Sequence, residues 1–456
     1  MKIKVNEYIG DKQFYKRLFT VAAPLILQQL ITTSVQLVDN VMVGKLGEQA
    51  IAAVAVINQL YFVIILITFG AMAGASVFAA QFYGSKDYDK LKQAFRFKLL
   101  IGFLIAFLSF VIFTFFGRGL IQLFTDNDST IDLALVYLKY ARWSAFPWIL
   151  SVAISSTFRE ISITKPLLVI SIVAILTNTF VNYLLIFGSW GFPKLGVEGA
   201  AIATLLSRFV EFFLVVILLQ LRGKIFNTKL SEILHIDKKI LTSIIIMAIP
   251  LLLNELLWST GQTVFLHAYS RRGDQALAAM NITSAISQLV FVTFGAIATA
   301  VAVLVGNTLG RNELDEARKN AKKLIATAVM VATVAGFILF ALSFFILNIY
   351  DVEDLTKNIA QFNIRINALF IPIYSFNVTL YFTLRSGGDT KSTFLMDAGY
   401  MWVLPVPLAL LLAYVTNLPV TMMFLMIQAM DIPKMAFGIS RYKKEHWVKN
   451  LAIHHE

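Results

Sequence analysis

Three acidic side chains, Asp39, Glu255 and Asp397, lie within or at the edge of long apolar stretches of the sequence. A charge at the centre of a bilayer costs roughly 2.5–3.5 kcal/mol on insertion scales. Acids in such stretches are therefore expected to face a partner or a polar cavity rather than lipid. Because such carboxylates can load H⁺ or Na⁺, or hold an organic cation, these three are the first candidates for a functional site.

Polar side chains that could accompany Asp39 occur further along the first half of the chain. Asn178 and Asn182 are one helical turn apart and share a face, and Thr204 is a weaker candidate for the same cluster. A proton needs only one carboxylate, whereas Na⁺ prefers several hard oxygens, which the two amides can supply. Asp39, Asn178 and Asn182 thus form a candidate cation-coupling site, for which H⁺ and Na⁺ both remain open.

Structural interpretations of the same residues also exist. Asp39 could lie at the outer membrane interface and cap the following loop, and the two asparagines could simply join helices by hydrogen bonds.

Upstream of Asp39, Pro24 interrupts the same apolar stretch. Since proline removes an internal helical hydrogen bond, Pro24 is a candidate hinge.

A second candidate site, for substrate or a further cation, lies in the other half of the chain. Glu255, Trp258 and Gln262 recur at helical spacing and share a face, and Tyr374 is an aromatic residue that could line the same cavity. Aromatic walls with an acid suit flat lipophilic cations. The alternative for Glu255 is a neutral, hydrogen-bonded glutamic acid, because burial favours the protonated form.

Other charged groups admit structural interpretations. Asp397 is about two helical turns from Lys391, so it either adds to the second site or pairs with a base near the membrane surface. Arg208 and Glu211 are three residues apart, which predicts an ion pair within one helix. Asp389 follows two glycines and predicts a helix cap.

Several kinds of chemistry have no supporting residues in this sequence. It contains no cysteine, which excludes disulfides, thiolate metal sites and thiol nucleophiles. The phosphate-binding loop G-x-x-x-x-G-K-[ST], the zinc motif H-E-x-x-H and the nucleophile elbow G-x-S-x-G are also missing. We therefore expect neither an enzyme nor a bound cofactor, and a transporter built this way would draw on an ion gradient.

Composition predicts an all-α integral membrane protein whose main partner is the lipid bilayer. Of the 456 residues, 58% are hydrophobic and 14% are charged, against roughly 45–50% and about 25% in soluble domains. The apolar stretches are continuous and long enough for membrane helices. Twelve spans are predicted, at residues 18–43, 50–82, 97–117, 133–158, 166–188, 197–221, 241–268, 277–309, 323–349, 359–384, 393–415 and 418–440.

The basic residues are concentrated in alternate loops. The net charge of +12 therefore reflects membrane topology rather than nucleic-acid binding. With twelve spans, the basic segments all fall on one side, which predicts cytoplasmic N- and C-termini. Arg271 and Arg272 are the main exception on the other side, where one loop, Asp351 to Asp354, is acidic. The basic segments are residues 2–17, 86–98, 222–239, 311–323 and 441–449.

An internal repeat divides the chain into two halves. Residues 47–53 (GEQAIAA) match residues 273–279 (GDQALAA), and the same offset of 226 relates Pro24 to Pro250 and Arg159 to Arg385. Six spans per half is an even number, so the repeats are parallel. The predicted regions are an N-terminal segment 1–17, an N-lobe 18–222, a cytoplasmic linker 223–240, a C-lobe 241–440 and a cytoplasmic tail 441–456.

Together these segments resemble the multidrug and toxic compound extrusion (MATE) family over residues 12 to 440. The resembling motifs include Val38–Gly44, Arg159–Lys165, Gly196–Ala201 and Arg385–Lys391. The resemblance implies two six-helix bundles forming a V around a central cavity, and cation-coupled efflux of organic compounds across the plasma membrane. It also places a family carboxylate of the N-lobe at Asp39 and one of the C-lobe at Glu255.

The resemblance leaves some expectations open. In some family members the position of Asn182 is an aspartate, so this chain has one carboxylate fewer in the N-lobe cluster. A lipid-linked saccharide flippase of related architecture is the alternative function, although such proteins generally carry extra spans and cationic cavities. The substrate is expected to be a small organic, cationic drug or metabolite, and the protein to work as a monomer.

Overall fold

The computed structural model describes residues 7–350 and 352–453, and every regular element in these ranges is helical. Lys2, Lys4, Asp351 and the last three residues of the predicted tail lie outside the described residues. The helices of the first half are α1 (Lys12–Gly44), α2 (Glu48–Gly84), α3 (Tyr88–Gln122), α4 (Asp128–Glu160), α5 (Lys165–Phe187) and α6 (Val197–Arg222), with short turns η2 (Ser189–Gly191) and η3 (Leu230–Glu232) after α5 and α6.

The second half repeats this order with more interruptions. Its elements are α7 (Lys238–Ser270), α8 (Asp274–Gly310), α9 (Leu314–Leu342), η4 (Ile346–Ile349), α10 (Asp354–Ser386), α11 (Thr390–Phe394), η5 (Leu395–Gly399), α12 (Tyr400–Val403), α13 (Pro405–Val415), α14 (Val420–Ala429) and α15 (Asp431–Lys443).

Helix bounds confirm the predicted repeat. The pairs α1 and α7, α2 and α8, and α4 and α10 have equal lengths of 33, 37 and 33 residues, and each pair starts 226 positions apart. A polar contact is repeated as well. Gln28 Nε2 donates to Ser171 Oγ at 2.7 Å, and 226 positions later Asn254 Nδ2 donates to Asp397 Oδ2 at 3.0 Å. The two halves therefore share one fold.

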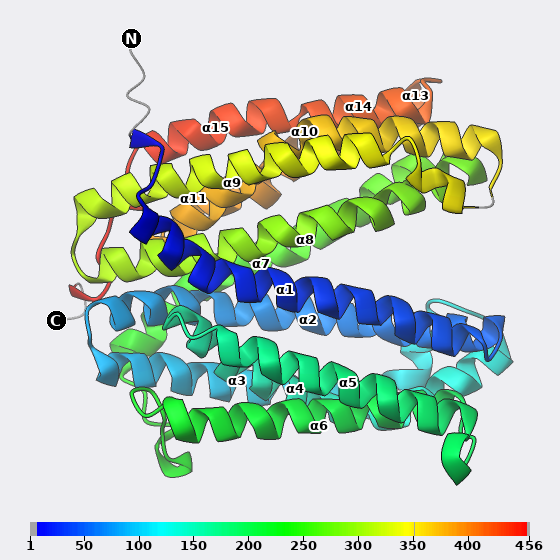
Figure 1. Cartoon of the computed structure of the whole chain (residues 1–456), viewed down its shortest axis with the longest axis horizontal. Helices are drawn as coiled ribbons and strands as arrows, with labels where there is room; N and C mark the ends of the chain where they lie inside the picture. The colour runs from blue at the N-terminus through cyan, green and yellow to red at the C-terminus, as the bar shows by residue number, and fades with distance from the viewer. Residues whose placement is uncertain (1–6, 351, 454–456) are drawn as a thin grey trace. The chain divides into compact units, whose positions relative to one another are not determined.

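The helices pack into two compact units, each with its own core. Unit 2 comprises Ala23–Tyr83 and Asp87–Ala248. Within it α4 packs against α3 and α6, and α5 packs against α6 (Figure 1). Gly199 on α6 permits the close approach of α5, because a Cβ atom there would lie 2.7 Å from the backbone of Leu185. Unit 2 holds the helices that carry the predicted cation-coupling cluster.

Unit 1 comprises the described residues up to Ala22, the turn Gly84–Lys86 and the chain from Ile249 onward. Its central element is α10, which packs against α8, α9, α14 and α15. The segment after α15 also packs onto this unit, since the Trp447 side chain is buried and Asn450 Nδ2 donates to Gly310 O at 3.2 Å.

Helices α1 and α7 each pass from one unit into the other. The change occurs between Ala22 and Ala23 in α1, and between Ala248 and Ile249 in α7. Both points immediately precede a proline inside the helix, Pro24 in α1 and Pro250 in α7. Because each proline removes a backbone hydrogen bond, these are the weakest points of the two helices.

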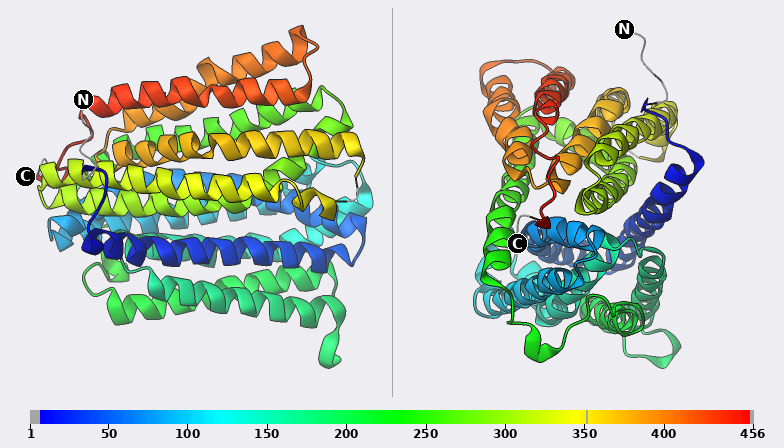
Figure 2. Two further views of the ribbon diagram at one scale, coloured as in Figure 1. Left: turned by 45° about the horizontal axis from the view of Figure 1, so that its top comes forward. Right: turned by 90° about the vertical axis from the view of Figure 1, so that its left-hand side faces the viewer.

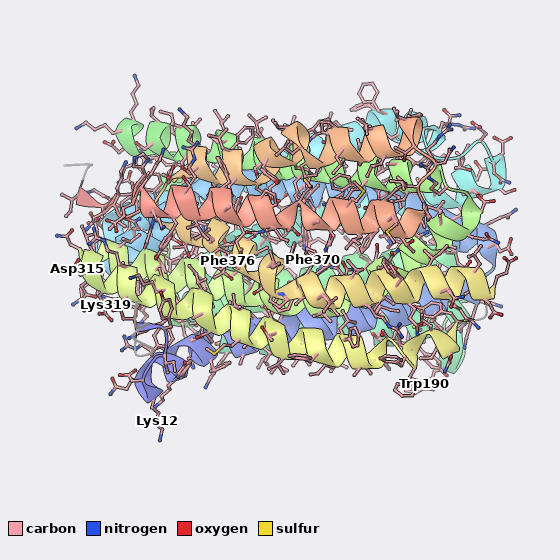
Figure 3. All side chains as sticks on the ribbon, turned by 90° about the horizontal axis from the view of Figure 1, so that it is seen from above. Lys12, Trp190, Asp315, Lys319, Phe370 and Phe376 are labelled. Atoms are coloured by element: carbon pink, nitrogen blue, oxygen red, sulfur yellow. The ribbon has the colours of Figure 1, made fainter. Side chains whose placement is uncertain are left out.

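The lengths and composition of the helices suit a membrane. Ten of the helical spans in the described residues are long and apolar enough to cross a bilayer, and α4 and α8, which are not among them, bring the total to the twelve predicted. In unit 1, Figure 3 shows Asp315 and Lys319 at the tip where α9 begins, whereas Phe370 and Phe376 lie along the length of α10. The predicted class, an all-α membrane protein of twelve helices in two repeats, is confirmed.

Three predicted spans differ in detail from the observed helices. The ninth was expected to run to residue 349, but α9 ends at Leu342, where Ser343 caps it and its hydroxyl donates to Phe340 O. The eleventh contains a π-helical turn, η5, and then breaks at Leu404 because Pro405 has no N–H to donate. The twelfth is divided at Met430 into α14 and α15.

Candidate functional site

Asp39 on α1 is contacted by an asparagine pair on α5. Asn182 Nδ2 donates to Asp39 Oδ1 at 3.0 Å and to Asn178 Oδ1 at 3.2 Å. Both asparagines are buried and Asp39 is half-buried. The grouping of Asp39, Asn178 and Asn182 that the sequence predicted is therefore present within unit 2.

Thr204 on α6 belongs to the surroundings of this cluster rather than to its bonded core. Its hydroxyl donates to Ala200 O at 3.0 Å and lies 3.4 Å from the hydroxyl of Tyr137 on α4. Tyr137 in turn is close enough to Asp39 to interact with it electrostatically. The threonine thus joins the cluster indirectly, through a tyrosine that sequence reasoning did not identify.

Arg208 is the guanidinium that acts electrostatically on Asp39, yet its direct partner is another residue. It forms the ion pair with Glu211 that the sequence predicted, at 2.9 Å. Its guanidinium also lies over the ring of Trp148, 6.0 Å from the centroid. The carboxylate of Asp39 is therefore held by an amide hydrogen bond, while the nearby positive charge is bound to its own acid.

The arrangement around Asp39 suits exchange of a single charge. A half-buried carboxylate that accepts a neutral hydrogen bond can take up one proton and keep its amide contact. The amide of Asn182 presents hydrogens, not oxygen, to both Asp39 and Asn178. In the described part of the chain, no group of three or more His, Cys, Asp or Glu side chains is placed to hold a metal ion.

Asp397 lies in the π-helical turn η5 of unit 1 and is paired with a base. Lys434 Nζ on α15 is 2.7 Å from Asp397 Oδ1, and Asn254 Nδ2 on α7 donates to Oδ2 at 3.0 Å. The other end of the Asn254 amide accepts from the backbone N–H of Ala398 at 3.1 Å. Of the two interpretations open for Asp397, pairing with a base is the observed one, but the base is Lys434 rather than the nearby Lys391.

This pair is largely removed from solvent. The side chains of Lys434 and Asp397 are 16% and 19% exposed. Hydrogen bonds to charged groups are roughly twice as strong as neutral ones, and Asp397 accepts two, one of them from an ammonium. Tyr374 on α10 and Asp431 on α15 lie close enough to this pair to interact with it electrostatically. The charge of Asp397 is thus already balanced within unit 1.

The other predicted members of the second site lie on one face of α7. Glu255 and Trp258 are half-buried and Gln262 is exposed. No hydrogen bond or ion pair of these three side chains occurs among the described residues. A different side of α7 packs against α12, where Trp402 Nε1 donates to Leu257 O at 2.8 Å. Glu255 therefore forms no ion pair among the described residues, although Arg385 lies close enough to interact with its carboxylate electrostatically.

Tyr374 packs against another aromatic side chain, with the two rings tilted relative to each other. Its ring centroid is 4.8 Å from that of Phe291 on α8, at an interplanar angle of 39°. The sequence position 226 residues earlier is Trp148, which lies over Arg208. Both aromatics thus flank the basic residue of the last helix in their own half.

Sequence reasoning missed the basic and amide partners of Asp397, although the repeat carried a signal for them. Lys434 is the repeat equivalent of Arg208 (434 − 226 = 208), so each half has a base at the same position. Asn254 is the equivalent of Gln28 (254 − 226 = 28). Applying the offset to every polar residue within the spans would have identified both.

A second buried ion pair, also missed, joins α3 to α4 in unit 2. Lys98 Nζ lies 2.5 and 2.6 Å from the two carboxylate oxygens of Glu160 and within 3.4 Å of the hydroxyls of Ser156 and Thr157. The Lys98 side chain is fully buried. Because all three N–H groups of the ammonium already have oxygen acceptors, the pair joins two helices and cannot donate to a ligand.

Comparison with known proteins places the chain among membrane exporters. The sequence model named MatE matches residues 24–184 and 250–411. The chain is 25% identical over 400 residues to the probable multidrug resistance protein YoeA of Bacillus subtilis, covering 87% of this chain and 86% of that protein. It is 27% identical over 412 residues to the probable multidrug resistance protein NorM of Bradyrhizobium diazoefficiens, covering 87% and 86%.

Solved structures share the fold. The MATE transporter VcmN of Vibrio cholerae in its bent form superposes with a TM-score of 0.87 at 19% identity, covering 96% of this chain and 98% of VcmN. An outward-facing MATE-family multidrug resistance transporter of the MOP superfamily gives a TM-score of 0.85 at 18% identity, covering 97% and 99%. Both matched segments of the MatE model begin at a proline, Pro24 or Pro250, where α1 and α7 change units.

Proposed function

The chain belongs to the MatE family of membrane transporters, and from that premise we propose that it exports small organic cations in exchange for H⁺ that binds Asp39. Members of this family are transporters rather than enzymes, and they require no cofactor. The observation that carries the proposal is the pairing of Asp39 on α1 with the amide of Asn182 on α5 at 3.0 Å.

Asp39 is favoured over Asp397 as the coupling carboxylate because of their partners. Asp397 is bonded to the ammonium of Lys434, and taking up a proton would remove the counter-ion that this ammonium contacts directly, leaving only the more distant Asp431. Asp39 accepts from a neutral amide, which can bond a protonated or an ionised carboxyl group. Binding a proton at Asp39 therefore changes the local charge by one and does not leave a directly bonded opposite charge without its partner.

Protons are favoured over Na⁺ because of the orientation of the Asn182 amide. Its Nδ2 group contacts two oxygens, those of Asp39 and Asn178, so its hydrogens fill the space where a sodium ion would need oxygen ligands. Turning the amide over would place its oxygen against two others, which either a bound cation or an O–H hydrogen bond from protonated Asp39 would have to compensate. A proton needs no such rearrangement.

Glu255 is the proposed contact for the positive charge of the substrate. Its carboxylate forms no ion pair among the described residues, and Trp258 is one turn along the same face of α7. An acid beside an aromatic ring attracts flat lipophilic cations through charge and cation–π interaction, about 0.5–2 kcal/mol for the latter. Gln262 and Tyr374 are secondary candidates for the same site.

Pro24 is the proposed hinge that links ion binding to movement. It lies 15 residues before Asp39 in α1 (39 − 24 = 15), roughly four turns of helix. A change in the bonding of Asp39 to α5 would alter the path of the helix beyond Pro24, where one backbone hydrogen bond is already missing. The proposed location is the plasma membrane, with cytoplasmic termini, and the proposed working form is a monomer.

The flippase alternative has less support. The similar proteins YoeA and NorM are described as multidrug resistance proteins. The predicted site residues are acids, amides and aromatics, and the two bases beside them, Arg208 and Lys434, are already paired with acids rather than left to bind a phosphorylated lipid carrier.

The experiment that tests the proposal is ethidium efflux from liposomes containing the purified chain. ΔpH and ΔNa⁺ are imposed separately, with Asp39→Asn alongside and Asp126→Asn, a change of the same type in an exposed loop, as the matched control. We expect efflux on ΔpH alone, lost in Asp39→Asn and retained in Asp126→Asn. Efflux that requires Na⁺ would replace the proposed ion, and equal efflux by both variants would remove Asp39 from the mechanism.

A further inference from the structure

The segment between α6 and α7, residues 223–237, is a folded part of unit 2 rather than a loose connection. Phe226 is fully buried, and its ring centroid lies 5.0 Å from those of both Phe95 on α3 and Phe158 on α4, edge-on to each. This aromatic anchor holds the segment beside the beginning of α3, at the end of unit 2 where α6 stops (Figure 2).

A single arginine fixes the remainder of the segment. Arg96 on α3 donates to Thr228 Oγ1 at 2.8 Å, to His235 O at 2.8 Å and to Glu232 Oε2 at 2.6 Å. The hydrogen bond from the Thr228 hydroxyl, followed by the charge of Arg96, lowers the pKa of Glu232. At neutral pH the clamp is therefore complete, and Arg96 and Glu232 neutralise each other.

The clamped segment, the first turns of α3 and the last turn of α6 border a cavity of about 950 Å³ that is open to solvent. Its charged lining residues are the bases Lys92, Arg96, Lys224 and Lys229 and the acids Asp89 and Glu232. The lining therefore carries a net charge of +2 (4 − 2). A cavity with this excess of positive charge favours an anionic ligand.

Ion pairing leaves two of these bases available. Arg96 is committed to Glu232, and Lys92 Nζ lies 3.2 Å from Asp89. Lys224 and Lys229 form no ion pair within the described residues, and both side chains are exposed. The amides of Gln220 and Asn227, which bond each other at 3.2 Å, add further hydrogen-bonding groups to the same wall.

Apolar side chains stand beside this cationic wall. Leu230 lines the cavity and is 87% exposed, and Leu234, one turn further on, is 77% exposed. Leu221, at the last turn of α6, is 70% exposed. Leucines left this open next to lysines, at the end of membrane-spanning helices, are typical of a surface that meets the headgroup and upper acyl region of a bilayer.

We propose that this cavity binds the phosphate-bearing headgroup of an anionic phospholipid, with Lys224 and Lys229 on the phosphate and Leu230 against the acyl chains. A free phosphate would use the lysines but would leave the exposed leucines without a role. A zwitterionic headgroup would bring its own cation into a cavity that already has a net positive charge. The site is separate from the residues proposed for coupling and for substrate, so it stands independently of the transport mechanism.

The test measures lipid binding to the purified full chain in a neutral detergent. Dihexanoyl-phosphatidylglycerol, dihexanoyl-phosphatidylcholine and inorganic phosphate are titrated separately, and the saturable shift in the thermal unfolding midpoint gives each dissociation constant. The double variant Lys224→Gln/Lys229→Gln is compared with Lys238→Gln/Lys239→Gln, which removes two exposed charges from the neighbouring start of α7 without touching the cavity lining.

We expect the cavity variant to raise the dissociation constant for phosphatidylglycerol at least tenfold and the control variant to change it less than twofold. Leu230→Ser/Leu234→Ser should weaken lipid binding several-fold and leave the response to phosphate unchanged. Equal losses in the two lysine variants, or equal binding of phosphatidylcholine, would overturn the site. A lysine-dependent response to inorganic phosphate alone, as large as that to the lipid, would overturn the lipid assignment in favour of a free anion.

Folding of the variants is checked by the unfolding midpoint without lipid. All the substituted side chains are exposed, so we expect midpoints within a few degrees of the parent. The single variants Lys224→Gln and Lys229→Gln provide a second reading, and each should account for part of the loss. If neither single variant weakens binding, the assignment of these two lysines is wrong.

Discussion

Each half of this chain holds an acid at a contact between the first and fifth spans of the repeat, but the two halves balance it differently. In unit 2, Asp39 on α1 accepts an amide hydrogen bond from Asn182 on α5, and the nearby base Arg208 is bound to Glu211. In unit 1, Asp397 accepts both an amide from Asn254 and the ammonium of Lys434. On the proposed mechanism, the carboxylate that is bonded by a neutral group changes its charge, and the one that is paired with a base joins helices.

The difference arises at equivalent positions. Gln28 and Ser171 form a neutral bond between α1 and α5, and Asn254 and Asp397 occupy the equivalent positions 226 residues later. Arg208 and Lys434 are equivalent as well. Three equivalent positions therefore differ between the halves. In the first half they hold a neutral Gln28–Ser171 hydrogen bond and a base, Arg208, that is paired elsewhere. In the second half they hold Asn254, Asp397 and Lys434, and Asp397 contacts the other two.

Replacing Asp39 with asparagine should have the largest effect on transport. Asparagine keeps the shape and an acceptor oxygen for the Asn182 amide but cannot load a proton, so ΔpH-driven ethidium efflux should fall to the level of empty liposomes. The unfolding midpoint should move by no more than a few degrees, because the hydrogen bond survives. A large drop in the midpoint would mean that Asp39 is structural, like Asp397.

Replacing Asp397 with asparagine should produce the opposite pattern. Removing one partner of a buried pair leaves the other charge uncompensated, which destabilises by about 3–5 kcal/mol, and here Asp431 still offsets part of the Lys434 charge. The partial exposure of Lys434 places this site at or below the low end of that range. We expect a clearly lower unfolding midpoint and reduced yield, measured against the parent in the same detergent.

The double variant Asp397→Asn/Lys434→Met controls for the loss of charge itself. Because it removes both members of the pair, much of the stability should return. If the loss of stability in the double variant equals the sum of the losses in the two single variants, the two residues are not coupled. Asp397 would then not be a carboxylate held by its base, and the contrast with Asp39 would be wrong.

Replacing Asn182 with aspartate should sharpen the question of the ion. The change converts the donor that faces Asp39 into an acceptor and adds a second carboxylate beside the oxygen of Asn178, which is the ligand type that Na⁺ prefers. We expect a Na⁺ gradient to drive measurable efflux in this variant, several-fold above the parent under the same gradient. Asn178→Ala in the same background should reduce that gain, and an unchanged response to Na⁺ would show that the amide orientation does not select the ion.

The smallest effects are expected at the equivalent amides, Gln28 and Asn254. Gln28→Leu removes a neutral hydrogen bond, which contributes about 0.5–1.5 kcal/mol. Asn254→Leu removes one to a charged group, about 1.5–3 kcal/mol, together with the neutral hydrogen bonds to Tyr381 and from the Ala398 N–H. The unfolding midpoint should therefore fall further for Asn254→Leu. Equal shifts would indicate that the charge of Asp397 adds nothing to its contact with α7.

The number and order of the helices could be predicted from the sequence because its two halves repeat at a constant offset. The offset of 226 relates the ends of three helix pairs residue for residue. The helical break at Leu404 was not predicted. Pro405 and Pro407 indicate a break, but the surrounding residues are apolar throughout, so the segment reads as one continuous span.

The candidate site was predicted only where its residues lie at helical spacing. Asn178 and Asn182 share a face in any α-helix, so their grouping could be read before any packing was known. Lys434 and Asp397 are 37 residues apart on different helices, and the π-helical turn of η5 changes the direction of Asp397. Their contact depends on tertiary packing, which spacing alone does not encode.

The equivalence of Arg208 and Lys434 also bears on how this chain arose from a duplicated ancestor. A base at the same place in both halves is most simply inherited from the single copy that existed before duplication. Each copy now pairs that base with an acid at a different position, Glu211 in one and Asp397 in the other. Since a buried base without an acid is costly, the change of partner marks a step at which the two copies diverged while each kept its base neutralised.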